Sequence, residues 1–144
     1  MVEFALLAPV LLLIVLGILY FGRFLNYTQD ETHIANLGAR WAAVNTTTPA
    51  GCTLASLQAC IQAQANGELA GGSTDVTNAG GSQGAQVCID FPNGTSQIGD
   101  PVRVTVQANF HFVPLLGIGT ISVPEVAVMR LEATNTNYSA GCSP

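Results

Sequence analysis

The sequence contains no lysine, and its four arginines and two histidines stand against nine aspartates and glutamates, for a formal net charge of −5. Nucleic-acid binding relies on clustered Lys and Arg side chains that displace counterions from phosphates. This charge balance therefore argues against a nucleic-acid partner. Charged residues make up only 9% of the chain, which is typical of an exported domain with a weakly charged surface.

Arrangements of residues that carry catalysis are also lacking. His33 and His111 are not grouped with cysteines or carboxylates at metal-ligand spacing. The cysteines lack the C-x-x-C spacing of redox and zinc sites. The glycine-rich stretch 67–84 contains no Gly-Lys-Ser or Gly-Lys-Thr of a phosphate loop. We therefore expect a protein that is not an enzyme and has no metal or cofactor.

What the sequence does have is an uninterrupted apolar run over residues 4–22, between Glu3 and Arg23. A membrane-spanning helix needs about 17 to 25 such residues. Secretory signals have a shorter apolar region, a basic stretch before it and a small-residue cleavage site after it. Bulky Tyr20 and Phe24 stand where that site would lie. The run thus predicts a retained membrane helix.

The helical pattern continues past the run to Val44 without a proline or a turn cluster. Apolar residues recur there at three-, four- and seven-residue steps, which predicts a helix face that covers the core of the domain. This face consists of Tyr27, Ile34, Leu37, Trp41 and Val44. Asp30 and Glu31 are interpreted as solvated residues just above the membrane.

A second face of the same helix carries the small residues Ala35, Gly38, Ala39 and Ala42. Small residues let another helix or a sheet approach closely, so Gly38, Ala39 and Ala42, with neighbouring Trp41, are candidate helix-packing residues. Forty-four helical residues would reach roughly 65 Å, about twice the hydrocarbon thickness of a bilayer. Such a length is unusual for a simple anchor.

Beyond Val44 the pattern changes from helix to strand. A short helix is predicted over 53–66, with Gly67 as its stop signal. A glycine-rich loop then leads to alternating segments that predict antiparallel strands. These are 86–91, 102–112 and 120–133, with at most a short strand near 75–78. Pro124 implies an edge position or a bulge. The expected fold class is α+β, with a long N-terminal hydrophobic helix packed on a small antiparallel sheet and a second short helix.

Four cysteines lie beyond the apolar helix: Cys52, Cys60, Cys88 and Cys142. An even number in an exported domain predicts two disulfides, with three possible connectivities. Eight residues of continuous helix would separate Cys52 and Cys60 by about 12 Å, beyond the roughly 7 Å that a disulfide spans. We favour this pair nonetheless, with Cys52 folded back outside the helix.

Three stretches of the chain, residues 2–26, 35–44 and 100–133, resemble the successive signatures of TadE-like proteins. These are pilin-like components of tight-adherence pili within the type IV pilin superfamily. In that family a prepilin peptidase cleaves after a glycine, which leaves a glutamate as the fifth residue of the mature chain. The resemblance gives that role to Glu3, which stands two positions short of this register.

The resemblance implies that Glu3 pairs with the α-amine of a neighbouring subunit during assembly; otherwise it lies at the lipid headgroups. Pro9 removes one helical hydrogen bond, so we expect it to kink or locally melt the helix, unless it is one of the prolines that membrane helices tolerate. Phe4, Gly17 and Gly22 complete the candidate assembly residues.

The leading hypothesis is a structural subunit of a surface filament used for attachment. Residues 1–25 would form the membrane and filament-core segment, and residues 26–144 the exported domain. Expected partners are copies of the chain, the inner membrane before assembly, the prepilin peptidase and the pilus assembly machinery. Two alternatives remain: a minor TadE-like pseudopilin that primes or caps another pilus, and a membrane-anchored extracytoplasmic binding module.

Overall fold

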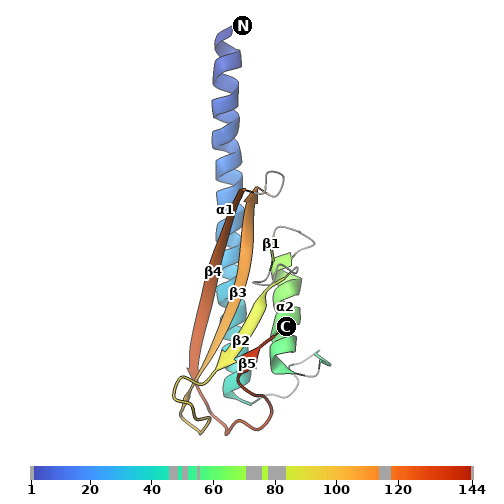
Figure 1. Cartoon of the computed structure of the whole chain (residues 1–144), viewed down its shortest axis with the longest axis vertical. Helices are drawn as coiled ribbons and strands as arrows, with labels where there is room; N and C mark the ends of the chain where they lie inside the picture. Colours follow the sequence, from blue (N-terminus) through green and yellow to red (C-terminus); the bar gives the residue numbers. More distant parts are fainter. Residues whose placement is uncertain are drawn as a thin grey trace.

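The computed structural model describes residues 2–45, 49, 52–54, 56–70, 76–77, 84–113 and 118–143. The N-terminal half of a long helix projects from a domain, in which the C-terminal half of the same helix packs against a sheet and a second helix (Figure 1). The elements are α1 (Val2–Ala43), α2 (Leu57–Ala70), β1 (Val76–Thr77), β2 (Gln86–Asp90), β3 (Pro101–Val113), β4 (Ile118–Arg130) and β5 (Gly141–Cys142). The predicted α+β class is confirmed.

Helix α1 continues without interruption through Pro9. Local melting at this proline is therefore wrong for this structure, and the alternative, a kink, stays a prediction. Proline removes only one backbone donor, and the turns on both sides of Pro9 keep their helical conformation. The helix begins well outside the domain, and its C-terminal half lies behind the sheet in the view of Figure 1.

The sheet is antiparallel throughout, and β3 is its central strand. On one side β3 pairs with β4 from Pro101↔Arg130 to Val113↔Ile118. On its other side β3 pairs with both β1 and β2, and β5 pairs with β2. Pro124 pairs with Gln107 in an unshifted register, so β4 has no bulge there. Within the described residues β4 pairs only with β3, which gives Pro124 an edge position.

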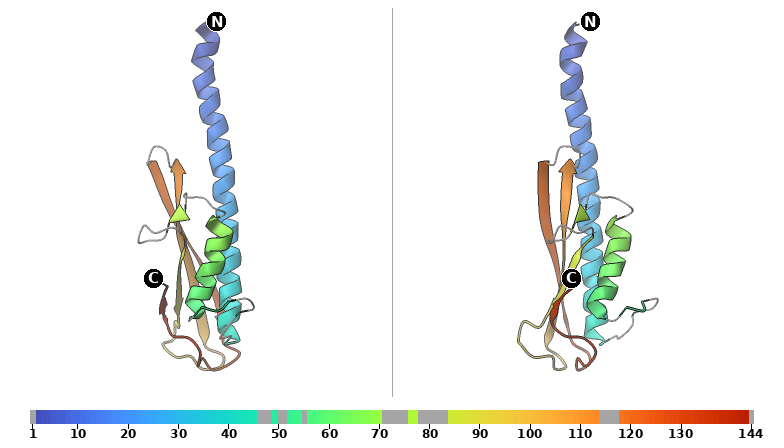
Figure 2. Two further views of the ribbon diagram at one scale, coloured as in Figure 1. Left: turned by 90° about the vertical axis from the view of Figure 1, so that its right-hand side faces the viewer. Right: turned by 45° about the vertical axis from the view of Figure 1, so that its right-hand side comes forward.

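Alternation along the strands directs one face of the sheet toward the helices. Buried residues on this inner face include Val87 and Ile89 of β2, and alternate positions of β3 from Val102 to Phe110. Helices α1 and α2 lie side by side on this face (Figure 2). The opposite face of the sheet is not covered by either helix, which leaves a two-layer domain.

The small-residue face of α1 forms the contact with the core. Ala35, Ala39 and Ala42 are buried, and a Cβ placed on Gly38 would lie 3.0 Å from Ile61 of α2 and 3.3 Å from Val104 of β3. Because α1 is wedged against both a helix and a sheet, only small side chains fit on this face.

The expected core face of α1 is confirmed only in part. Ile34 is fully buried, and Tyr27 and Trp41 are half-buried against the core. Leu37 is half-buried, and Val44 is 49% exposed. Apolar spacing identified a real stripe, yet α2 and the sheet approach the helix mainly from the neighbouring small-residue side.

The second helix begins and ends later than predicted. Ser56 caps its N-terminus, with its Oγ accepting a hydrogen bond from the Ala59 N–H at 3.2 Å. The helix then continues through Gly67 to Ala70, so Gly67 is not its stop. A glycine inside a helix costs about 1 kcal/mol, and burial of Leu69 in the core offsets that cost.

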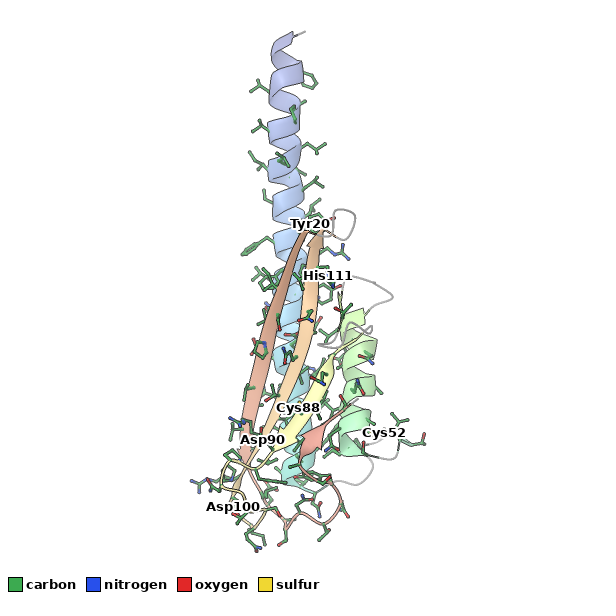
Figure 3. The ribbon with its side chains drawn as sticks, viewed as in Figure 1. Tyr20, Cys52, Cys88, Asp90, Asp100 and His111 are labelled. Carbon is green, nitrogen blue, oxygen red and sulfur yellow. A yellow bond between two sulfur atoms is a disulfide. The ribbon has the colours of Figure 1, made fainter. Side chains whose placement is uncertain are left out.

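Two disulfides connect parts of the domain. Cys52 bonds Cys60, the pair favoured from the sequence, with Cα atoms 5.8 Å apart. Cys52 precedes α2, as that pairing requires. Cys88 of β2 bonds Cys142 of β5, a two-residue strand with no signal in the sequence pattern. This second bond holds the C-terminal segment against the sheet (Figure 3).

Candidate assembly interface

The described part of the apolar half of α1 is largely exposed. Its large aliphatic and phenylalanine side chains described between Phe4 and Phe21 are 40–77% exposed. Within the described residues, α1 is the one helix long and apolar enough to cross a membrane, and none of its most apolar 18-residue window is buried. Mean hydropathy over that window is 2.2. A monomer in water would carry this surface at a large free-energy cost, so the segment requires an apolar partner.

The assembly residues expected from the sequence are distributed around the helix. Phe4 and Gly22 are eighteen residues apart, about five full turns, and so share one face. Gly17 lies on a different face, because five residues rotate the helix by about 140° from Gly22. Gly17 and Gly22 have open space where a Cβ would be. Glu3 lies in the first turn of α1, and its side chain is outside the described atoms.

An aromatic cluster marks the level at which α1 enters the domain. The ring of Phe110 in β3 lies 4.9 Å from the Tyr27 ring and 5.8 Å from the Phe24 ring, between centroids. Tilted ring pairs at these distances are favourable beyond their simple burial. The cluster therefore packs the end of the sheet that lies closest to the N-terminal half of α1 against this helix.

A buried acid lies just past this cluster. Glu31 is only 4% exposed, so the expectation that it is solvated is wrong. The Ala108 N–H of β3 donates a hydrogen bond to its carboxyl group, while the Oε2 atom has no partner. Burial first, and then the nearby charge of Glu125 on β4, raise the pKa of Glu31 from 4.5 to about 8. At neutral pH the group is thus largely protonated.

The signal for this burial was present in the sequence. Glu31 stands four, seven and eleven residues before Ala35, Gly38 and Ala42, which is the spacing of one helix face. The prediction treated Asp30 and Glu31 as one solvated acidic pair and therefore missed the burial of Glu31.

The far end of α1 is held by the C-terminal segment of the chain. Asn45 adopts a positive φ of 54°, which asparagine tolerates better than most residues. Its Nδ2 donates to the Thr134 carbonyl and to Thr136 Oγ1, both at 3.0 Å. The Tyr138 hydroxyl donates to the Ala42 carbonyl at 2.7 Å. Burial raises the pKa of Tyr138 to about 12, so this donor keeps its proton at neutral pH.

Both histidines take part in local contacts of the domain. His33 Nδ1 lies 3.4 Å from Glu68 Oε2, across the contact between α1 and α2. His111 Nε2 lies 3.1 Å from the Thr77 hydroxyl, and its Nδ1 lies 3.2 Å from the Thr120 hydroxyl. Among the residues that the structure describes, no group of three or more His, Cys, Asp or Glu could hold a metal ion.

Residues 1–40 match the family model described as TadE-like protein. Over this range the chain is similar to TadE-like proteins. The match covers the exposed half of α1 and most of its packed half, and it ends before α2. No curated protein and no solved structure matches the chain. The similarity is thus limited to α1, and the fold of the rest of the domain is described from the structure alone.

Proposed function

We propose that this TadE-like protein is a structural subunit that polymerises through the apolar half of α1 into an extracellular filament for surface attachment. The observation that carries the proposal is the exposure of the large aliphatic and phenylalanine side chains described in this half, while the other half of the same helix is packed into a domain with two disulfides. A filament of such subunits would have the apolar halves at its centre and the domains outside.

The energetics favour two successive environments for the apolar half. In lipid it gains little from helix association beyond packing, because acyl chains are as apolar as its own side chains. Outside the membrane, each large side chain buried against another copy contributes about 1.5 to 3 kcal/mol relative to water. Among the side chains that the structure describes between Phe4 and Phe21, twelve such large ones are exposed. Outside the bilayer, dissociation of subunits from the filament would thus be strongly unfavourable.

The proposal places the subunit in the inner membrane before assembly and on the cell surface afterwards. Its partners would be other copies of the chain, a prepilin peptidase and the pilus assembly machinery. Glu3 would pair with the α-amine of the neighbouring copy, since a carboxylate inside a membrane or an apolar filament core is costly without a partner.

The decisive experiment is to shear filaments from cells that express the chain and to identify their bulk component by mass and by imaging. We expect this chain to be the main component. Trace amounts in filaments built from another subunit would contradict the proposal and favour a minor pseudopilin. The absence of any filament-associated chain would favour a membrane-anchored binding module.

The role of Glu3 has a separate test with a matched control. Glu3→Gln removes the charge with little change of shape, and we expect a large loss of filament yield at an unchanged level of membrane-bound subunit. Glu132→Gln makes the same change at an exposed residue of the domain and should leave the yield unaltered. Equal yields from both variants would exclude the pairing role.

A further inference from the structure

A groove lies along α1 where the helix leaves the apolar run and meets the end of α2. This junction groove has a volume of about 500 Å³. Helix α1 contributes Leu19, Arg23 and Asp30 to its lining in that order, and α2 contributes Glu68 and Leu69. A second hollow of about 280 Å³ lies farther along the apolar half and shares Leu19 and Arg23 with the groove. The combined surface is thus apolar at one end and charged at the other.

The charged part of the junction groove lies just beyond the expected membrane boundary. If residues 4–22 span a hydrocarbon layer of about 30 Å, its boundary lies close to Gly22. Arg23 is the next residue, and Asp30 lies about 10 Å farther along α1. A phospholipid beside α1 would therefore have an acyl chain along the apolar hollow and its phosphate at the level of Arg23. The rest of its headgroup would lie toward Asp30.

The charges that line the junction groove are ordered by sign. Among its described lining residues, Arg23 is the one cation, and Asp30 and Glu68 are the anions. A guanidinium binds phosphate oxygens through charge-assisted hydrogen bonds. The two carboxylates beyond it favour a cationic group. A zwitterionic phospholipid presents its charges in the matching order, with the phosphate nearer the bilayer and the cation farther out.

Helix α2 brings a further negative potential to this site. It runs antiparallel to α1, because Glu68 lies 3.4 Å from His33 while Ile61 lies against Gly38, farther along α1. The C-terminal end of α2 therefore points toward the exposed half of α1 (Figure 1). Carbonyl groups at a helix C-terminus carry partial negative charge and favour a cation. Glu68 lies in the last turn of α2, so both sources of negative potential coincide.

Both carboxylates can accept further hydrogen bonds. Asn26 Nδ2 donates to Asp30 Oδ2 at 3.1 Å, and Gln64 Nε2 donates to Glu68 Oε1 at 2.5 Å. These amide donors orient the carboxylates without neutralising their charge. A carboxylate has about four lone-pair positions, so each can also accept from an ammonium group. A primary ammonium group offers three N–H donors, whereas a trimethylated one offers none.

We propose that the junction groove binds one phospholipid of the bilayer that holds residues 4–22, with a preference for a headgroup that carries a primary amine, as in phosphatidylethanolamine. Arg23 contacts the phosphate, Asp30 and Glu68 contact the ammonium group, and an acyl chain lies along the apolar hollow. The lipid then joins α1 and α2 at the membrane surface and is lost when the subunit leaves the bilayer. The inference rests on the membrane-bound stage of the proposed function.

The test measures which lipids remain bound to the full chain. The chain is placed in nanodiscs with equal amounts of phosphatidylethanolamine, phosphatidylcholine and phosphatidylglycerol, and the lipids retained after release are measured by native mass spectrometry. Asp30→Asn with Glu68→Gln removes both anions, and Arg23→Gln removes the cation. Glu132→Gln and Arg40→Gln are the matched controls, because they make the same changes at exposed residues outside the groove. Both disulfides are verified in every variant.

We expect the unmodified chain to retain phosphatidylethanolamine over phosphatidylcholine by about fivefold, the size expected for two partly exposed ion pairs. The double variant at Asp30 and Glu68 should lose this preference and still retain phospholipid. Arg23→Gln should retain less of all three lipids, and both control variants should behave as the unmodified chain. Soluble glycerophosphoethanolamine, which lacks acyl chains, should not displace the retained lipid.

Two results would overturn the amine preference: equal retention of the two lipids by the unmodified chain, or a preference that survives the double variant. Displacement by glycerophosphoethanolamine would overturn a bilayer lipid as the ligand. A Phe21→Trp probe reports membrane insertion separately, through quenching of its added emission by brominated acyl chains. A quenched probe without any retained phospholipid would overturn this proposal alone. A probe that is not quenched would overturn the membrane-bound stage as well.

Discussion

The two halves of α1 form one continuous helix and follow opposite packing rules. From Phe4 to Phe21 the helix presents large apolar side chains in all directions. From Glu31 to Ala42 it presents a narrow buried face of mostly small residues, with polar residues such as Thr32, His33 and Asn36 exposed.

The difference follows from the partner of each half. Lipid chains, or several neighbouring helices, accept bulky side chains on every side of a helix. A sheet and a second helix that meet the same turn at Gly38 accept only small ones. A helix can therefore have one continuous backbone and two different surfaces. A substitution in one half can then change its packing without changing that of the other half.

The largest expected effect comes from releasing the segment that holds the packed half. Cys88→Ser with Cys142→Ser opens a loop with a separation of 54 residues and should lower the free energy of unfolding by about 4 kcal/mol. Cys52→Ser with Cys60→Ser opens a separation of only 8 residues and should cost about 2.5 kcal/mol. Urea denaturation in detergent checks the order, and a reversed order would contradict the loop-length argument.

A second prediction concerns pH and the buried acid of the packed half. The pKa of Glu31 is about 8 in the folded chain against an ordinary 4.5, so the folded state holds a proton that the unfolded state releases. Stability is therefore highest below pH 4.5 and falls as the pH rises through 8, by roughly 3 kcal/mol between pH 5 and pH 8. Denaturation at a series of pH values measures this slope.

Variants at the two facing carboxylates sharpen the same measurement. Glu31→Gln cannot ionise and should remove most of the slope. Glu125→Gln removes the repelling charge, so the pKa of Glu31 should fall and the slope should end at a lower pH. An unchanged slope in Glu31→Gln would assign the pH dependence to another group.

A third prediction compares glycines in the two halves. Gly38→Val places atoms against Ile61 and Val104 and should destabilise the domain by about 2 kcal/mol through overpacking. Gly22→Val meets open space and should leave thermal unfolding of the domain unchanged. Equal destabilisation by both variants would show that small residues serve a common purpose along α1.

The smallest effect is expected at the end of the packed half. Asn45→Ala removes the hydrogen bonds to Thr134 and Thr136 and places alanine at a positive φ, for a loss of about 1 kcal/mol. Asn45→Gly loses the same hydrogen bonds but accepts the backbone conformation. Urea midpoints of the two variants separate these contributions. An Asn45→Ala midpoint equal to that of the unmodified chain would contradict the proposed clamp.

Local sequence patterns predict those parts of the structure that depend on residues close together in the chain. The apolar run 4–22 and the alternation of β3 are readable from residue order alone. Hydrophobic periodicity depends only on helix and strand geometry, so it predicts elements well. The similarity to TadE-like proteins over residues 1–40 is likewise a property of the residue order.

Contacts between distant segments decided the rest. The side of α1 that faces the core, the burial of Glu31 and the extension of α2 past Gly67 depend on how closely a helix and a sheet approach α1. Strand β5 exists because Cys142 lies opposite Cys88, 54 residues earlier. Periodicity along one element identifies its faces, but the choice of buried face is a free-energy comparison among whole packing arrangements, and that comparison includes residues far away in the chain.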